Sequence, residues 1–114
     1  MPTVLLMEDQ EDLRDYFAYE LMRGGWLCLI AADSTEALRL YRDHPVDALV
    51  VDLTLKGSPM SGAALVRECL ALRPCVVVIT SGTVDDGSVA CALWIQKPFV
   101  VRAAVGRIRG LLPN

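Results

Sequence analysis

The chain has 114 residues, of which 54% are hydrophobic, and its 11 basic and 14 acidic side chains give a net charge of −3. This length and apolar content predict one packed domain over residues 1–114. The acidic balance argues against a nucleic-acid binder, which shows a strong basic excess, and the absence of an apolar run of about 18 residues argues against a membrane span.

Short apolar runs alternate with helical patterns along the whole chain. The run at 4–7 is continuous and apolar, as in a buried strand, whereas Leu13, Phe17 and Leu21 stand four apart, as on one face of a helix. In chain order we predict a strand over 4–7, a helix over 11–23, a strand over 26–30, a helix from Ser34 to just before Pro45, a strand over 48–51, a helix over 61–72, strands over 75–80 and 93–96, and a helix over about 100–112.

Side chains and glycines indicate where these helices begin, end and face the core. Gly24 and Gly25 would end the first helix, and Ser34 has the side chain of an N-cap for the second. Other residues predicted to face inward are Leu38, Tyr41, Leu65, Cys69, Leu72, Val101, Val105, Ile108 and Leu112.

Residues 81–90 are polar and contain glycine, and their helical periodicity is weak. We expect at most about one turn of helix there, since a 3.6-residue apolar repeat is the main helix signal. The alternation of strands and helices elsewhere predicts an α/β fold, with a doubly wound parallel sheet, right-handed crossovers and helices on both faces.

Four cysteines, at positions 28, 69, 75 and 91, form no C-x-x-C pair, and His44 is the only histidine. We therefore expect buried free thiols in a reducing compartment, the cytoplasm, rather than a disulfide or zinc framework. The N-terminus shows no basic segment or cleavage site of a signal peptide. A start at Met1 and the lack of a linker after the last helix predict a stand-alone domain.

Polar residues follow four of the predicted strands. Glu8 and Asp9 follow the first, Asp52 the third, Thr80 ends the fourth, and Lys97 follows the fifth. Functional groups of doubly wound sheets collect at the carboxyl ends of the strands. We therefore expect these five side chains to lie together.

This combination permits phosphoryl chemistry. Crowded carboxylates repel one another unless a cation joins them, and Mg²⁺ binds oxygen ligands from one or two carboxylates, water and phosphate. A carboxylate can also act as a nucleophile and form an acyl phosphate. A metal ion and a nearby ammonium would neutralise the oxygens of the transferred group.

Four motifs in this order resemble the receiver domain of two-component response regulators. Residues 4–9 (VLLMED) resemble the family's first strand and acidic pair, and 50–53 (VVDL) its phosphoacceptor strand. Residues 78–82 (VITSG) resemble the switch segment, and 96–99 (QKPF) the Lys-Pro-Phe ending. The resemblance covers nearly the whole chain and implies a flavodoxin-like five-stranded sheet in the order 2-1-3-4-5.

The resemblance also implies a role for each site residue. Asp52 would accept the phosphoryl group, Lys97 would pair with it, and Thr80 would be the switch hydroxyl. The metal ion, Mg²⁺ or Mn²⁺, would bind Asp9 and Asp52 directly, Glu8 through water and the backbone carbonyl of Thr54. Trp94 would occupy the switch-aromatic position, and the Lys97–Pro98 bond would be cis.

A receiver of this kind would take its phosphoryl group from a histidine kinase or histidine phosphotransfer protein and signal by binding a further protein. It would catalyse only its own phosphorylation and dephosphorylation. Neither nucleic acid nor a membrane is an expected partner.

Two segments depart from the family pattern. The loop after Asp52 is longer than usual and carries Lys56, which could compete with a phosphodonor, assist it, or simply be solvated. Only 16 residues separate Thr80 from Lys97, fewer than usual, so the fourth helix should be short or absent. That shortening puts the usual dimer surface and the switching of Trp94 in question.

Other interpretations remain open for individual residues. The acidic pair could be a helix N-terminal pair, Asp52 a turn or cap residue, Thr80 a structural polar group and Lys97 a solvent-facing cation. Arg102, Arg107 and Arg109 form a basic face on the last helix, either solvated or a binding surface for a partner.

Two other functions are compatible with parts of the sequence. The first is a phosphorylation-independent adaptor that keeps the receiver fold and uses the shortened segment as a constitutive surface. The second is a small hydrolase with an Asp nucleophile, which would need a substrate pocket built by longer loops or a cap domain. The chain has no room for these and no P-loop or G-x-G-x-x-G motif.

Overall fold

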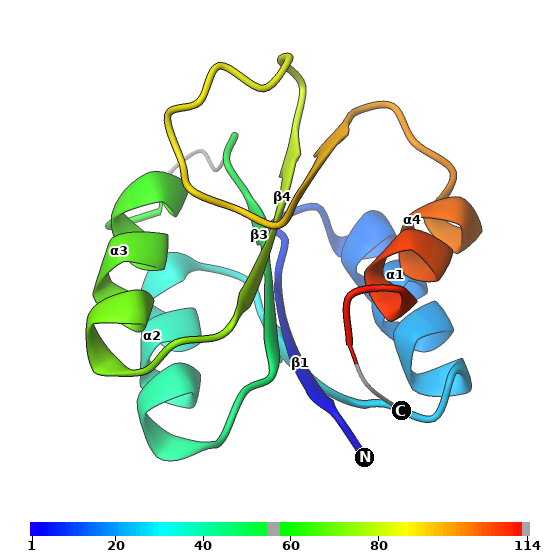
Figure 1. Cartoon of the computed structure of the whole chain (residues 1–114), viewed down its shortest axis with the longest axis horizontal. Helices are drawn as coiled ribbons and strands as arrows, with labels where there is room; N and C mark the ends of the chain where they lie inside the picture. Colours follow the sequence, from blue (N-terminus) through cyan, green and yellow to red (C-terminus); the bar gives the residue numbers. More distant parts are fainter. Residues whose placement is uncertain (55–57, 113–114) are drawn as a thin grey trace.

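A computed structural model describes residues 1–54 and 58–112. Within this part of the chain, a parallel five-stranded sheet in the order β2-β1-β3-β4-β5 lies between two pairs of helices (Figure 1). The strands are β1 (Thr3–Met7), β2 (Leu27–Ala31), β3 (Ala48–Asp52), β4 (Val76–Ser81) and β5 (Leu93–Gln96), and the helices are α1 (Glu11–Arg23), α2 (Ser34–Asp43), α3 (Gly62–Leu72) and α4 (Val101–Arg109). The predicted fold class and strand order are confirmed.

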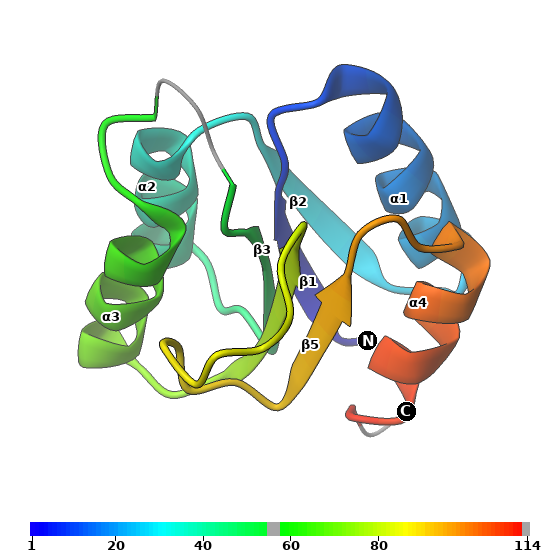
Figure 2. The same cartoon turned by 90° about the horizontal axis from the view of Figure 1, so that it is seen from above.

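The central strands are apolar because both of their faces are covered. Every residue of β1 and β3 is buried. Alternate side chains enter two separate cores: Leu6 and Val50 pack toward α1 and α4, whereas Leu5 and Val51 pack toward α2 and α3. Figures 1 and 2 show these helix pairs on opposite faces of the sheet.

The helices bury most of the residues predicted to face inward, with two exceptions. Leu13 is only partly buried, whereas Phe17 and Leu21 on the same face of α1 are fully buried. Leu72 is 46% exposed, because it ends α3, where the helix no longer lies on the sheet core.

The N-cap of α2 is Asp33, and the prediction of Ser34 is wrong. The Asp33 carboxylate accepts a hydrogen bond from the Glu36 backbone N–H at 2.9 Å, as an N-cap side chain does. Ser34 is the first helical residue and is fully buried, and its hydroxyl accepts hydrogen bonds from the Ser58 hydroxyl at 2.7 Å and the Met60 N–H at 3.0 Å. It therefore joins the start of α2 to the chain that leads into α3.

Some element boundaries differ by a residue or more from the predictions. Strand β2 begins at Leu27, after the buried Trp26, and β4 spans 76–81 rather than 75–80. Helix α4 ends at Arg109, although Leu112 beyond it is still buried.

No helix forms between β4 and β5, which confirms that the fourth helix of the family pattern is absent here. Residues 82–92 instead form a loop on the α3 side of the sheet (yellow in Figure 1). Val89 is 8% exposed and packs into the core under α2 and α3, and the Ala92 N–H donates to the Val77 carbonyl at 2.8 Å. The loop is therefore attached to the sheet by packing and by backbone hydrogen bonding.

All four cysteines are free thiols, as predicted, but only Cys69 is fully buried, whereas the other three are partly exposed. Among the described helices, none is both long enough and apolar enough to cross a bilayer.

Candidate functional site

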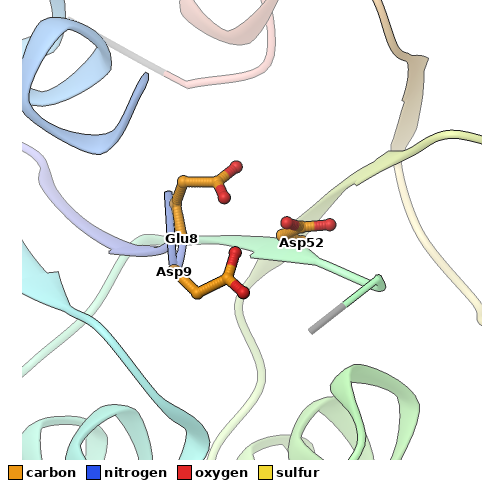
Figure 3. A group of neighbouring side chains, drawn as sticks. All are labelled: Glu8, Asp9 and Asp52. Carbon is orange, nitrogen blue, oxygen red and sulfur yellow. The ribbon is translucent and has the colours of Figure 1, made fainter. Parts of the chain in front are cut away.

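Three carboxylates meet at the carboxyl edge of the sheet. Glu8 and Asp9 directly follow β1, and Asp52 ends the neighbouring β3 (Figure 3). One oxygen from each side chain lies within 4.8 Å of the other two. Glu8 and Asp52 are each 2% exposed, whereas Asp9 is open to solvent. The predicted grouping of these three residues is therefore present.

Lys97 lies between the two buried carboxylates. Its Nζ is 3.0 Å from Asp52 Oδ2 and 3.1 Å from Glu8 Oε1. Its backbone N–H donates to the Ser81 carbonyl at 2.6 Å, so the residue continues the pairing of β5 with β4. The Lys97–Pro98 peptide bond is cis, as predicted. The solvent-facing alternative for Lys97 is excluded by this double ion pair.

The second oxygen of Asp52 is held by Thr54. Oδ1 accepts hydrogen bonds from the Thr54 hydroxyl at 2.7 Å and from the Thr54 backbone N–H at 2.9 Å. Each oxygen of Asp52 therefore has at least one donor, and the carboxylate is fixed in orientation. The role of the Thr54 hydroxyl was not predicted. The backbone contact has the spacing of an Asx turn, in which an Asp side chain accepts from the N–H two residues further along the chain.

These contacts shift the pKa values of Glu8, Asp52 and Lys97 in different ways. The pKa of Glu8 is raised to about 7, mainly by burial and also by the Asp52 charge, against the lowering effects of the Gln10 backbone N–H and Lys97. Burial also acts to raise the pKa of Asp52, but hydrogen bonds from Thr54 and Lys97 outweigh it and lower the pKa. Burial acts to lower the pKa of Lys97, yet the two carboxylates raise it.

The cluster has the composition of a divalent-cation site. With all groups ionised, three carboxylates face one ammonium, which leaves two negative charges at the sheet edge. Burial is the main cause of the raised pKa of Glu8, and the negative charge of Asp52 adds to it. Carboxylate oxygens are the ligands preferred by hard divalent ions, so the residues present fit such an ion.

Thr80 lies beside Asp52, because the two residues are register partners on β3 and β4. Thr80 is 2% exposed, and its carbonyl accepts the Leu53 N–H at 3.0 Å. Thr80 therefore lies beside Asp52 as predicted, and its role as the switch hydroxyl stays a prediction.

Trp94 lies away from this cluster, on the α2–α3 side of β5, where it packs partly buried into that core. Its indole N–H donates to the Thr83 carbonyl at 2.9 Å, and the Thr83 hydroxyl lies 3.0 Å from the Ser81 hydroxyl. Trp94 thus holds the loop 82–92, a contact that was not predicted because it needs the loop's tertiary position. Lys56, the other residue predicted near the site, lies outside the described residues.

No family profile matches the chain, but curated proteins do. The chain is 32% identical over 103 residues to an NtrX-like response regulator of Rickettsia bellii, an alignment that covers 84% of this chain and 22% of that protein. It is 30% identical over 118 residues to the sensory transduction protein RegX3 of Mycolicibacterium smegmatis, covering 98% of this chain and 51% of that protein. The chain therefore spans about half or less of the length of these relatives.

Solved structures share the fold over almost the whole chain. The chemotaxis protein CheY4 of Vibrio cholerae superposes with a TM-score of 0.88 at 20% identity and covers 98% of this chain and 99% of its own. The response regulator TrrA of Thermotoga maritima, solved in complex with Mg²⁺-BeF, superposes with a TM-score of 0.84 at 20% identity. The superposition covers 98% of this chain and 100% of the TrrA chain. At this identity the similarity establishes a CheY-like fold.

The raised pKa of Glu8 predicts a pH dependence of stability in metal-free buffer. Between pH 4.5 and about 7 the unfolded chain loses the Glu8 proton while the folded chain keeps it. The free energy of unfolding should therefore fall with rising pH relative to Glu8→Gln, by up to about 3 kcal/mol, and level off above pH 7. Urea unfolding of both variants in EDTA measures this difference.

Glu11→Gln, at an exposed position of α1, is the matched control and should leave the pH profile of the wild type unchanged. If the difference in the free energy of unfolding between wild type and Glu8→Gln does not change across this pH range, the pKa of Glu8 is not raised in the folded protein.

Proposed function

Because this chain is a receiver domain by its CheY-like fold and by its response-regulator relatives, we propose that it accepts a phosphoryl group on Asp52 in two-component signalling. The observation that carries the proposal is the buried Asp52 carboxylate, held by Lys97 on one oxygen and Thr54 on the other. The receiver domain would comprise residues 1–114.

Asp52 has the properties that a nucleophile at this position requires. Its lowered pKa keeps the carboxylate ionised at neutral pH, and the contacts with Thr54 fix its orientation. One Asp52 oxygen would attack phosphorus, forming the O–P bond of an acyl phosphate, while the P–N bond of a donor phosphohistidine breaks and its electron pair returns to the imidazole.

Lys97 would supply the positive charge that moves with the reaction. Its ammonium is 3.0 Å from Asp52 at rest and would follow the negative charge onto an oxygen of the incoming phosphoryl group. Its pairing with Glu8 at 3.1 Å keeps the side chain at the site during that shift. A Thr80 hydroxyl beside Asp52 would then donate a hydrogen bond to another phosphoryl oxygen.

A divalent ion, Mg²⁺ or Mn²⁺, would be held by Asp9 and Asp52, by Glu8 through water, and by the Thr54 backbone carbonyl. When bound, such an ion neutralises phosphoryl oxygens and so lowers the barrier to transfer. The close approach of the three carboxylates supports this assignment, as does the Mg²⁺-BeF complex of the similar protein TrrA.

The donor would be a histidine kinase or a histidine phosphotransfer protein, and the signal would pass to a further protein by binding. The chain would catalyse only its own phosphorylation and dephosphorylation. Its four free thiols favour the cytoplasm, where reducing conditions keep thiols free. Neither nucleic acid nor a membrane is among the proposed partners.

The test is the intact mass of the protein after incubation with acetyl phosphate and Mg²⁺. Wild type should gain one phosphoryl group, and Asp52→Asn should gain none. Lys97→Met should be modified more slowly, by about a hundredfold or more, because it removes a charge aimed at the transferred group. Asp43→Asn, at an exposed position of α2, should behave as wild type.

Two results would overturn the proposal. The first is a folded wild-type protein that gains no mass at any Mg²⁺ concentration. The second is an equal gain in Asp52→Asn, which would place the modification elsewhere.

A second function is favoured by the loop between β4 and β5. Its attachment through Val89 and the Trp94 indole gives this surface a defined shape without phosphorylation. We propose as an alternative that the chain acts as a phosphorylation-independent adaptor through this loop, with Trp94 as its anchor rather than as a moving switch.

The two functions differ in how affinity for a downstream protein responds to phosphorylation. The adaptor predicts equal affinity for wild type, Asp52→Asn and acetyl-phosphate-treated wild type, and weaker binding by Trp94→Phe, which loses the hydrogen bond to Thr83. Calorimetry with a partner captured from extract measures this. A change in affinity of about tenfold or more on phosphorylation would exclude the adaptor.

A further inference from the structure

A second charged region lies between α1 and α4, away from the carboxyl edge of the sheet. These helices run side by side on one face (Figures 1 and 2). A cavity of about 420 Å³ opens between them, lined by Glu20, Arg23, Arg102, Val105, Gly106 and Arg109. Helix α1 begins at Glu11, two residues after Asp9. Glu20 lies nine residues further along the helix, or about 14 Å at the rise of an α-helix. None of the residues that line the cavity belongs to the cluster around Asp52.

Two of its arginines form ion pairs with one buried acid. Glu20 is 6% exposed, and its Oε1 lies 3.5 Å from Arg23 Nη1 and 3.5 Å from Arg102 Nε. A guanidinium carries five N–H donors, and each of these arginines shows only one nitrogen in contact with Glu20. Their other donors remain available to a second acceptor.

The third arginine has a different support. The Arg109 guanidinium lies over the Trp26 ring, 5.7 Å from its centroid, and against Gly24 at the end of α1. Within residues 1–54 and 58–112, Arg109 forms no ion pair with a carboxylate. Three guanidiniums and one carboxylate give the cavity a charge of +2, on a chain whose net charge is −3.

One glycine lines the cavity and another lies against Arg109, and neither is required by its backbone. Gly24 has φ −77°, which any residue adopts, but a Cβ there would lie 1.8 Å from Arg109 Nη2. Gly106 lies inside α4, where glycine destabilises a helix, and a Cβ there would meet no atom within 4 Å. The missing side chain at Gly24 leaves room for the Arg109 side chain, and the missing side chain at Gly106 leaves the cavity open.

From this geometry we propose that the cavity between α1 and α4 binds a small phosphate-bearing anion through Arg23, Arg102 and Arg109. Guanidinium groups bind phosphate oxygens in pairs of parallel hydrogen bonds. A phosphomonoester carries close to two negative charges at neutral pH, which matches the +2 charge of the site, whereas a carboxylate carries one. The cavity volume of about 420 Å³ is within the range of small-molecule sites, about 300–1,000 Å³.

The test is a titration with inorganic phosphate, followed by the backbone amide and arginine Nε resonances in EDTA. Acetate at equal ionic strength is the anion control. Phosphate should shift residues 20–24 and 102–109 saturably, with a Kd below about 1 mM. Arg109→Gln and Gly106→Leu should each weaken binding by about tenfold or more, because one removes a guanidinium and the other fills the cavity.

Matched variants separate this site from general charge effects. Arg67→Gln removes one exposed positive charge from α3, and Asp52→Asn alters the site at the sheet edge, so both should keep the wild-type Kd within about twofold. Gly106→Ala should bind phosphate with the wild-type Kd. Thermal unfolding reports whether Gly106→Leu is folded. If that variant is unfolded, the phosphate affinity of Arg109→Gln alone tests the proposal.

Three results would overturn the proposal. They are shifts that do not saturate or that acetate reproduces, binding that folded Gly106→Leu retains, and a Kd that Asp52→Asn changes by about tenfold or more in either direction. The last would place the phosphate at the sheet edge instead. Because Asp52→Asn is expected to bind normally, failure here leaves the proposed phosphorylation of Asp52 untouched.

Discussion

Two buried carboxylates that share one ammonium are the interaction on which the rest of this structure depends. Glu8 and Asp52 have almost no contact with water, and Lys97 lies within 3.1 Å of both. Such a group is costly to bury unless every charge is paired. The parallel sheet provides the pairing, because it brings the ends of β1, β3 and β5 together from distant parts of the chain. The remaining excess of negative charge then favours a divalent ion.

Much of the sheet edge could be predicted from the sequence, because strand ends in a doubly wound fold meet at one edge. The positions of Glu8, Asp52 and Lys97 follow from the alternation of strands and helices alone. The hydrogen bond from the Thr54 backbone N–H to Asp52 could have been found from the spacing of these residues, which is that of an Asx turn. By contrast, the bond from Trp94 to Thr83 depends on how a loop without regular structure packs, and no periodicity in the sequence indicates that.

The wrong predictions for Ser34 and Leu72 both concern features that depend on how the helices pack in the folded chain. Ser34 and Asp33 are adjacent and both have N-cap side chains, and only the buried contacts of Ser34 with Ser58 and Met60 decide between them. Leu72 fits the apolar repeat of α3, yet the helix extends past the core at that point. The cavity beside α4 was visible in the sequence only as a basic helix face. Its shape depends on Gly106 in α4 and on side chains of α1, two helices that meet only in the fold.

The central claim is that the carboxylates at the sheet edge form one divalent-cation site around Asp52. It is tested most directly by titrating wild type, Asp9→Asn and Asp12→Asn with Mg²⁺ in a calorimeter. Asp12 is an exposed acid in the first turn of α1 and serves as the matched control. The account predicts one saturable site in wild type and Asp12→Asn, and binding weaker by about tenfold or more in Asp9→Asn. Absence of Mg²⁺ binding, or equal binding by all three proteins, would contradict it.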